Sequence, residues 1–413
     1  MKRIVPLFIM IPVVVFSALV LAREDTPASE GAQLGTDFVV VRAYYEDPSM
    51  VSKVAAANEP WSVNEEEGYI LLSATPLEYD RLESLGFRLE VDEKLTALYS
   101  APKERLPGQI SGIDGYPCYR TVEETFASAE QIVQDHPTLA EWVDAGDSWE
   151  KVTPGGLAGY DIMVLKLTNK MIPGPKPVLF LTSGLHAREY TPPELNTRFA
   201  EYLVSSYDID ADVTWLLDYH ELHLLLITNP DGRKQAESGL FWRKNTNADY
   251  CSPSSSNRGA DLNRNFTFEW GNWGGSSPSE CDSTYRGPSP ASEPEIQAVQ
   301  AYGRSIFPDQ RDDALTAAAP EDAMGVYLDM HSSGNLVLWP WGFTTQPAPN
   351  GTALQTLGRR FAYFNGYDPD QSISLYPADG TSEEFGYGEL GAATYTIEMG
   401  QTFFESCGYF ENT

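Results

Sequence analysis

From residue 38 to about residue 95, the spacing of hydrophobic residues predicts short strands and short helices that alternate along the chain. Two helical patterns lie at 50–58 and 77–85. Four segments rich in Val, Ile, Leu, Tyr or Trp predict strands, at 38–45, 61–64, 68–74 and 87–91. The resulting order, β-α-β-β-α-β, is typical of a small α+β open sandwich, which we expect to end near residue 95.

A second, longer pattern begins near Cys118 and predicts a different architecture. Thr121, with Glu124 three residues on, predicts a capped helix over 121–134. Five short apolar runs predict buried strands, at 161–167, 178–182, 222–227, 326–330 and 395–399. Further helical patterns lie between them, at 193–205, 292–306 and 353–364. Apolar strands separated by helices indicate an α/β sheet covered on both faces.

The first 22 residues predict a secretory signal peptide. A basic start at Lys2 and Arg3 precedes an uncharged apolar run over 4–22, and small residues come just before Arg23. An uncleaved membrane anchor is the alternative, because the run approaches the length of a bilayer-spanning helix. We expect the signal to be removed. The protein is then secreted, extracellular or periplasmic, and not attached to a membrane.

Residues 99–117 predict a linker between two domains. This stretch is rich in Gly and Pro and shows no periodic pattern. Lys103 and Arg105 lie within it, so a trypsin-like protease could cut the chain here. The linker separates an N-terminal domain at 23–98 from a larger domain at 118–413.

Composition narrows the class of function. The chain has 59 acidic and 28 basic residues and a net charge of -31, which excludes nucleic acid as a partner because a polyanion would be repelled. Hydrophobic residues make up 42%, which is too many for a disordered acidic chain. The four cysteines all follow the signal and allow two disulfides, in any of three pairings.

Two histidines lie where an open α/β sheet places its ligands. His186 follows one predicted strand and His331 follows another, and the carboxyl ends of such strands meet at one edge. Glu189 is three residues after His186, so both side chains can reach one metal ion. This pair is weak evidence alone, because chance produces it often. The other histidines, at 136, 220 and 223, are interpreted as structural or surface groups.

Further polar residues fall in or near predicted strands. Glu398 lies in the apolar strand YTIEM, where a buried carboxylate is costly unless it is used or paired. The segment from Asp261 to Phe266 combines an acid, two amides and Arg264. Taken separately, Glu398 could be a buried ion-pair partner and Arg264 a surface charge.

Together these residues resemble the zinc carboxypeptidases of the carboxypeptidase A/B type, over most of residues 115–400. Five motifs occur in the family's order: GLHAREYTPPE, NPDG followed by FWRKN, DLNRNF, LDMHSSGNLVLWPWG, and LYPADGTSEEFGYGELG leading to TYTIEMG. The resemblance implies a mixed, mostly parallel sheet with helices on both faces, after a small α+β prodomain. It also implies one Zn²⁺ per chain and hydrolysis of the C-terminal bond of peptides and proteins.

The resemblance gives each candidate residue a role. It implies that Asp261 orients the zinc ligand His186. It also implies that Glu398 is the general base and that Arg243 stabilises the oxyanion. The implied zinc ligands are His186, Glu189 and His331. The implied binders of the substrate's α-carboxylate are Asn263, Arg264 and Tyr376, with Arg188 beside them.

Glu383 is the residue from which we predict specificity. It lies seven residues after Tyr376, at the position that in this family faces the substrate's terminal side chain. A carboxylate there pairs with a basic side chain and is costly to bury against an apolar one. We expect release of C-terminal Lys or Arg, with some activity on bulky apolar residues.

The resemblance also bears on the ends of the chain. It implies that the N-terminal domain is a propeptide, released by an activating protease, from an enzyme that is a monomer. A permanently attached accessory domain is the alternative. It implies a disulfide between Cys251 and Cys281, which leaves Cys118 to pair with Cys407. The family continues into a long final helix, so we expect residues 118–413 to lack it.

Two other functions remain open at this point. Related zinc enzymes trim the peptide stems of bacterial cell walls. A catalytically inactive homologue could also keep the pocket and bind peptides. The complete set of His186, Glu189, His331 and Glu398 favours an active enzyme. Asn263, Arg264 and Tyr376 favour ordinary C-terminal trimming, because all three address a free carboxylate.

Overall fold

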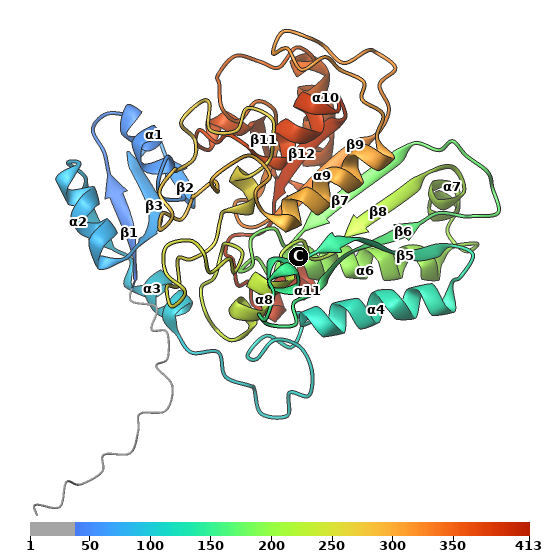
Figure 1. Cartoon of the computed structure of the whole chain (residues 1–413), viewed down its shortest axis with the longest axis horizontal. Helices are drawn as coiled ribbons and strands as arrows, with labels where there is room; N and C mark the ends of the chain where they lie inside the picture. Colours follow the sequence, from blue (N-terminus) through green and yellow to red (C-terminus); the bar gives the residue numbers. More distant parts are fainter. Residues whose placement is uncertain (1–37) are drawn as a thin grey trace, which may run out of the picture. The chain divides into compact units, whose positions relative to one another are not determined.

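The computed structural model describes residues 38–413 (Figure 1). The predicted signal peptide at 1–22, and residues 23–37 of the predicted propeptide, lie outside the described residues. In the described part, no helix is both long and apolar enough to cross a bilayer. Two sheets organise the chain, one of four strands and one of eight.

The four-stranded sheet has the predicted β-α-β-β-α-β order. Its elements are β1 (Val39–Tyr44), α1 (Ser49–Ala55), β2 (Ser62–Asn64), β3 (Tyr69–Ala74), α2 (Pro76–Ser84) and β4 (Arg88–Val91). The strand order is β2-β3-β1-β4, and every pairing is antiparallel. Alternate residues of the central strands, such as Val41, Ala43, Ile70 and Leu72, are buried together beneath the helices.

A helix that the sequence pattern did not predict follows this sheet. α3 (Glu93–Ser100) begins where Asp92 accepts a hydrogen bond from the amide of Leu95 at 3.0 Å. Thr96 holds the helix against β1, because its hydroxyl accepts a hydrogen bond from the amide of Val40 at 2.8 Å. The helix is only about two turns long, which is too short for its apolar period to be recognised in the sequence.

The eight-stranded sheet is mixed and mostly parallel, as predicted. Its strands are β5 (Ala140–Asp147), β6 (Asp161–Leu167), β7 (Val178–Ser183), β8 (Glu221–Leu225), β9 (Val326–His331), β10 (Leu336–Trp339), β11 (Asp368–Gln371) and β12 (Ala393–Glu398), in the order β11-β10-β12-β9-β7-β8-β6-β5. The central strands β8, β7, β9 and β12 are parallel to one another. Antiparallel pairings occur between β10 and β12, β8 and β6, and β6 and β5.

Helices cover both faces of this sheet (Figure 1). Leu222 and Leu224 of β8 pack with residues of α4 (Val122–Asp135), α6 (Thr191–Ser206) and α7 (Ala211–Tyr219). The next residue, Leu225, packs on the opposite face with α9 (Pro294–Ile306). A third group packs α10 (Gly351–Asn365) against β10 and β12. The predicted α/β class is therefore confirmed.

Shorter helices complete the described elements. They are α5 (Trp149–Val152), α8 (Pro230–Glu237), η1 (Leu262–Arg264), η2 (Ser372–Ser374), η3 (Glu384–Glu389) and α11 (Cys407–Asn412). The predicted cap of α4 is present. Thr121 accepts from the amide of Glu124 at 3.3 Å, and Glu124 accepts from the amide of Thr121 at 3.0 Å.

Both predicted disulfides are present. Cys251 pairs with Cys281, with Cα atoms 4.9 Å apart, in the long segment between α8 and α9. Cys118 pairs with Cys407, with Cα atoms 5.5 Å apart, and this bond joins residues 289 positions apart. The second bridge therefore fastens the start of the larger domain to α11.

An aromatic cluster joins the N-terminal sheet to the larger domain. Trp61 and Tyr99 pack against Phe241, Phe403 and Phe404, and we call these five residues the Trp61 cluster. The ring centroids of Trp61 and Phe403 lie 5.3 Å apart, and those of Tyr99 and Phe241 lie 4.9 Å apart. Such edge and tilted contacts stabilise buried aromatic pairs. The two parts of the described chain thus share a hydrophobic core.

Candidate metal centre and active site

The candidate site lies at the carboxyl ends of the central parallel strands. His186 follows β7 by three residues, His331 ends β9 and Glu398 ends β12. β9 and β12 pair in parallel, and His331 is directly opposite Glu398 in their register. The topology therefore brings together residues that are more than 200 positions apart in the sequence, as expected for this edge of an α/β sheet.

Three side chains converge here in a way that suits a metal ion. Nδ1 of His186 lies 2.7 Å from Oε1 of Glu189, and Nδ1 of His331 lies 3.1 Å from Oε2. The two Nδ1 atoms are 3.1 Å apart, and all three residues are buried. One ligand atom from each can reach a common point, and two nitrogens with one carboxylate are a donor set that zinc accepts.

Each histidine of this centre has a second carboxylate behind it. Nε2 of His186 is 3.3 Å from Oδ1 of Asp261, as the sequence analysis predicted. Nε2 of His331 is 2.8 Å from Oδ2 of Asp329, a contact that was not predicted. A signal for it was available, because Asp329 precedes His331 by two residues in a strand and so lies on the same face.

Arg243 and Asp261 form a buried ion pair beside the metal centre. Arg243 donates from Nη2 and Nε to Oδ2 of Asp261, at 2.8 and 3.2 Å. Both side chains are almost fully buried. Arg243 and the neighbouring Arg264 hold the pKa of Asp261 well below its usual range, despite the opposing effect of burial. Asp261 is thus a fixed negative charge behind His186.

Glu398 has an environment that differs from that of Asp261. Burial raises the pKa of its carboxyl to about 8, although nearby His331 acts against this change. A bound divalent cation would lower that pKa, because positive charge favours the ionised form. Glu398 lines a pocket, and it forms no ion pair with another described residue. It is therefore placed as a group that can gain and lose a proton.

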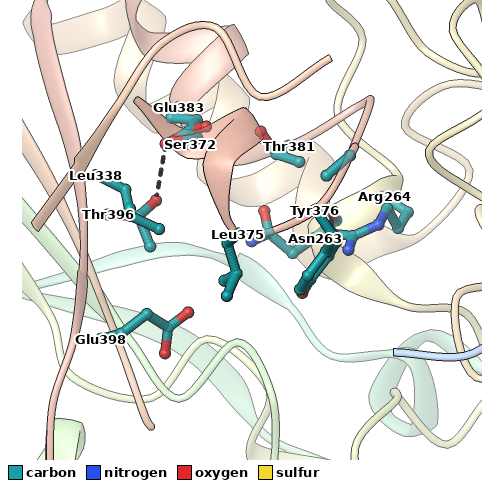
Figure 2. Close-up of a pocket in the computed structure, with 11 residues that line it drawn as sticks. Asn263, Arg264, Leu338, Ser372, Leu375, Tyr376, Thr381, Glu383, Thr396 and Glu398 are labelled. Carbon is teal, nitrogen blue, oxygen red and sulfur yellow. Dashed lines mark hydrogen bonds between the residues drawn. The ribbon is translucent and has the colours of Figure 1, made fainter. Parts of the chain in front are cut away.

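The pocket beside Glu398 contains most of the predicted substrate residues. Figure 2 shows Asn263, Arg264 and Tyr376 together at one side, and Glu398 and Thr396 at another. The remaining lining residues are Leu338, Ser372, Leu375, Ala378, Thr381 and Glu383.

Arg264 is held rigidly and keeps one nitrogen free. Its Nε donates to the carbonyl of Gly275 at 3.1 Å, and its Nη1 donates to the carbonyl of Asn263 at 2.6 Å. Nη2 has no hydrogen-bond partner in the described part of the chain, although the residue is buried. A buried guanidinium nitrogen without a partner is costly, and an anion bound in the pocket would satisfy it.

Two adjacent carboxyls, Glu383 and Glu384, are buried, and the first of them lines the pocket. Glu383 accepts a hydrogen bond from the Thr396 hydroxyl at 3.1 Å, and burial raises the pKa of Glu383 to about 7. Glu384 accepts from the amide of Gly342 at 2.8 Å, and burial, reinforced by Glu383, raises its pKa well above the usual range. Gly342 makes room for them, since a Cβ there would lie 3.0 Å from each carboxyl.

Arg188 lies outside this pocket. Its guanidinium carbon is 4.2 Å from the centre of the Phe241 ring and 4.4 Å from that of Phe403. It forms an ion pair with Glu59 of the N-terminal sheet domain, and Arg243 forms a second ion pair with the same carboxylate. The sequence analysis missed Glu59, because no local pattern marks a residue whose partners are 129 and 184 positions away.

The other histidines are placed as structural groups, in line with their interpretation. His223 is buried, and its Nδ1 is 2.7 Å from the hydroxyl of Tyr302. His220 directly follows α7, and its Nδ1 is 3.2 Å from the carbonyl oxygen of Leu216. His136 ends α4. None of these three belongs to the metal-binding group found among residues 38–413.

Comparisons with known proteins agree with this geometry. A family model described as zinc carboxypeptidase matches residues 126–411. A zinc carboxypeptidase of Saccharothrix mutabilis subsp. capreolus is 30% identical over 368 residues, which cover 86% of this chain and 75% of that protein. Zinc carboxypeptidase A 1 of Anopheles gambiae is 30% identical over 298 residues, which cover 68% of this chain and 60% of that protein.

A solved structure supports the fold. The crystal structure of carboxypeptidase A from Helicoverpa armigera matches with a TM-score of 0.68 at 20% identity. The match covers 91% of this chain and 92% of the other, so it extends beyond the larger domain into the N-terminal sheet. The predicted zinc cofactor follows from the matched family together with the His186, Glu189 and His331 group. The chain belongs to the zinc carboxypeptidase family, whose members are zinc-dependent hydrolases of C-terminal peptide bonds.

Proposed function

We propose that this protein releases the C-terminal residue of peptides and proteins, with zinc held by His186, Glu189 and His331. The free nitrogen of Arg264 is the observation that supports the proposal most directly. Arg264 lines the same pocket as Glu398, and a guanidinium with an unpaired nitrogen is suited to a substrate's α-carboxylate. An internal peptide segment has no such charge, so this arrangement favours an exopeptidase.

The proposed roles of the remaining residues follow from their positions. Asn263 and Tyr376 lie beside Arg264 (Figure 2) and can donate further hydrogen bonds to the terminal carboxylate. Zinc supplies Lewis-acid activation of the scissile carbonyl and of water. Glu398 takes the proton of the attacking water and delivers it to the leaving amine. Arg243, which is always charged, stabilises the developing oxyanion.

Replacing Glu398 tests this function. We expect Glu398→Gln to fold and to keep one zinc per chain, yet to lose nearly all turnover of blocked dipeptides, because an amide cannot accept the proton. The measurements are kcat after proteolytic removal of the N-terminal domain and zinc content after dialysis. Glu141→Gln, at an exposed position of β5, is the matched control and should behave as wild type.

Two results would contradict the proposal. Near-normal turnover of the zinc-loaded Glu398→Gln variant would remove Glu398 as the base. Failure of wild type to cleave any of a panel of dipeptides with varied C-terminal residues would reject the exopeptidase function. His331→Ala tests the ligand set separately, since it should reduce the zinc content by itself.

The pocket supports a preference for basic C-terminal residues. Glu383 is one of its lining residues, and a Lys or Arg side chain would pair with the ionised form of this carboxyl. Leu338 and Leu375 also line the pocket and can contact the aliphatic part of such a side chain, or a bulky apolar residue. We therefore propose Lys or Arg as the preferred terminal residue, with weaker cleavage after apolar residues.

The N-terminal domain is proposed to act as a propeptide that keeps the enzyme inactive. Glu59 supports this role, because its carboxylate forms ion pairs with Arg243 and Arg188 and so occupies the proposed oxyanion-stabilising group. A cut in the linker at 99–117 would allow the domain to leave. The two disulfides support secretion into an oxidising compartment, extracellular or periplasmic.

A further inference from the structure

Asp329 is a fully buried carboxylate between the metal centre and the substrate pocket. It lies in β9, two residues before His331. The register places it directly opposite Thr182 of β7 on one side and Thr396 of β12 on the other. Because alternate residues of neighbouring strands share a face, Asp329, His331 and Glu398 all lie on one face of the sheet. The carboxylate is therefore fixed by the strands themselves.

The hydrogen bonds of Asp329 show what it does. Oδ1 accepts from the hydroxyl of Thr182 at 2.6 Å, and Oδ2 accepts from the hydroxyl of Ser382. Oδ2 also lies 2.8 Å from Nε2 of His331. In the described part of the chain, no Lys or Arg forms an ion pair with Asp329. A buried carboxylate without a paired cation is stabilised mainly by its hydrogen bonds. Of its three partners here, only the imidazole of His331 can carry a positive charge.

We propose that Asp329 is a positioning residue for the zinc ligand His331. Asp329 accepts a hydrogen bond from the Nε2–H group of His331, and this fixes the tautomer of the imidazole. The free lone pair is then on Nδ1, the nitrogen that faces Glu189 and His186. The carboxylate also makes the imidazole a stronger donor to the metal ion. Asp329 then does for His331 what Asp261 does for His186, and both zinc-binding histidines have an acidic partner.

Ser382 extends this arrangement to the substrate pocket. Its hydroxyl donates to Asp329, and its amide donates to Oδ1 of Asn263 at 2.9 Å. The next residue is Glu383, which lines the pocket. Ser382 thus fixes the loop that carries Glu383 and one proposed binder of the α-carboxylate. Removing its hydroxyl should affect substrate binding more than metal binding, which separates the two roles.

The test compares the zinc affinity of aspartate variants by chelator competition. We expect Asp329→Asn to weaken zinc binding about 10- to 100-fold, because a neutral amide accepts the Nε2 proton less strongly. Asp261→Asn should lose affinity to a similar extent. Asp379→Asn is the matched control, since Asp379 is fully buried and accepts from Ser276 and Trp273 but contacts no zinc ligand. Its zinc affinity should equal that of wild type.

Two further readouts separate positioning from structural support. The absorption spectrum of the cobalt-substituted protein should change in Asp329→Asn, because cobalt reports the ligand geometry, and should stay unchanged in Asp379→Asn. Ser382→Ala should keep zinc affinity near that of wild type and raise KM. Asp329→Ser provides a second replacement in case the Asn variant folds poorly. These measurements use the full chain, loaded with zinc or cobalt.

Several outcomes would overturn the inference. Zinc affinity of Asp329→Asn equal to that of wild type, while Asp261→Asn loses affinity, would show that His331 needs no acidic partner. Loss of folding in both Asp329 variants, with zinc present and with Asp379→Asn folded, would make Asp329 a structural residue. The inference rests on the proposed ligand role of His331. If His331→Ala kept its zinc, that role would fail, and this result is distinguishable from the others.

Discussion

Four buried carboxyls around the site differ in charge because their neighbours differ. Asp261 is fixed as an anion by Arg243, and its pKa lies well below the usual range. Burial raises the pKa of Glu398 to about 8 and that of Glu383 to about 7. Asp329 is held by two hydroxyls and His331. Environment therefore assigns separate tasks to chemically similar groups, as in other acid–base sites.

The sequence allowed the prediction of residues that lie in recognisable motifs, and it failed for residues defined by long-range contacts. His186, Glu189 and His331 converge as predicted, because strand ends of an α/β sheet meet at one edge. Glu59 could not be predicted, since its partners belong to another part of the fold. Asp329 could have been found from its spacing to His331, although nothing in the sequence reveals the hydroxyls of Thr182 and Ser382.

At the scale of single residues, the charge of Glu383 should make the enzyme's substrate specificity depend on pH. Its raised pKa of about 7 means that the carboxyl is neutral below that pH and ionised above it. The ratio of kcat/KM for substrates ending in Arg and in Phe should therefore rise about tenfold or more between pH 5.5 and 8.5. Titration of Glu398 affects both substrates alike, so the ratio isolates Glu383.

Glu383→Ile provides the comparison for this prediction. We expect the Arg-to-Phe ratio to fall at least about 30-fold at pH 8.5, the loss expected when a buried charge partner is removed. The ratio should also stop changing with pH. A wild-type preference for Phe at pH 8.5, or a pH-dependent ratio in the variant, would show that another group sets the charge of the pocket.

At the scale of elements, the predictable parts were those with a strong local pattern. The predicted strands β6, β7, β8, β9 and β12 are mostly apolar runs, and the α4 cap is encoded by Thr121 and Glu124. The strands β5, β10 and β11 were missed. β5 and β11 are edge strands with several polar residues, and β11 reads DPDQ. Their pairing supplies an extended conformation that local propensity does not dictate.

The contact between α9 and α5 should make stability depend on pH. Glu295, in the first turn of α9, is fully buried and accepts from the amide of Trp149, the first residue of α5, at 2.8 Å. Burial, reinforced by nearby Glu293, raises the pKa of Glu295 to about 8. In the unfolded chain it titrates near 4.5, so the folded state binds the additional proton between these values.

Stability should consequently fall as pH rises from about 4.5 to about 8, by up to about 5 kcal/mol from this group. The measurement is the thermal midpoint of zinc-saturated wild type and of Glu295→Gln across that range. The amide stays neutral, so the variant should have the flatter profile and should be the more stable protein above pH 8. Parallel profiles would show that Glu295 does not lose its proton in the folded state over this range.

For the whole molecule, the fold class was predictable, while the contacts between the N-terminal sheet and the rest of the chain were not. The Trp61 cluster combines side chains from residues 61 to 404, and hydrophobicity alone does not reveal their partners. The net charge of -31 is a property that the sequence does give directly. It should attract peptides with basic ends, which agrees with the proposed specificity.

The linker should be cut at one of its two basic residues. Lys103 packs over the rings of Phe404 and Tyr116, at 4.3 and 5.4 Å, and donates to the carbonyl of Leu98. Burial lowers its pKa to about 8. The side chain of Arg105 is 57% exposed and contacts Asp114. A trypsin-like protease needs an accessible cationic side chain, so we expect the cut to follow Arg105.

N-terminal sequencing of the trypsin-treated protein checks this expectation, and the new chain should begin at Leu106. Carboxypeptidase activity should appear with the cut. Arg105→Gln should block both events, whereas the matched variant Lys103→Gln should be processed as wild type. A new N-terminus at Glu104, or activation of the Arg105→Gln variant at the normal rate, would contradict the assignment.

The Cys118–Cys407 bridge makes a closed covalent ring of the chain between these two residues. A single cut in any loop within the ring opens it but releases no fragment, because both new ends remain attached through the bridge. A molecule nicked by surrounding proteases would therefore keep all its proposed catalytic residues on one covalent piece. The nick would be visible on a gel only after reduction. The cut after Arg105 falls outside the ring, and so it can free the N-terminal domain.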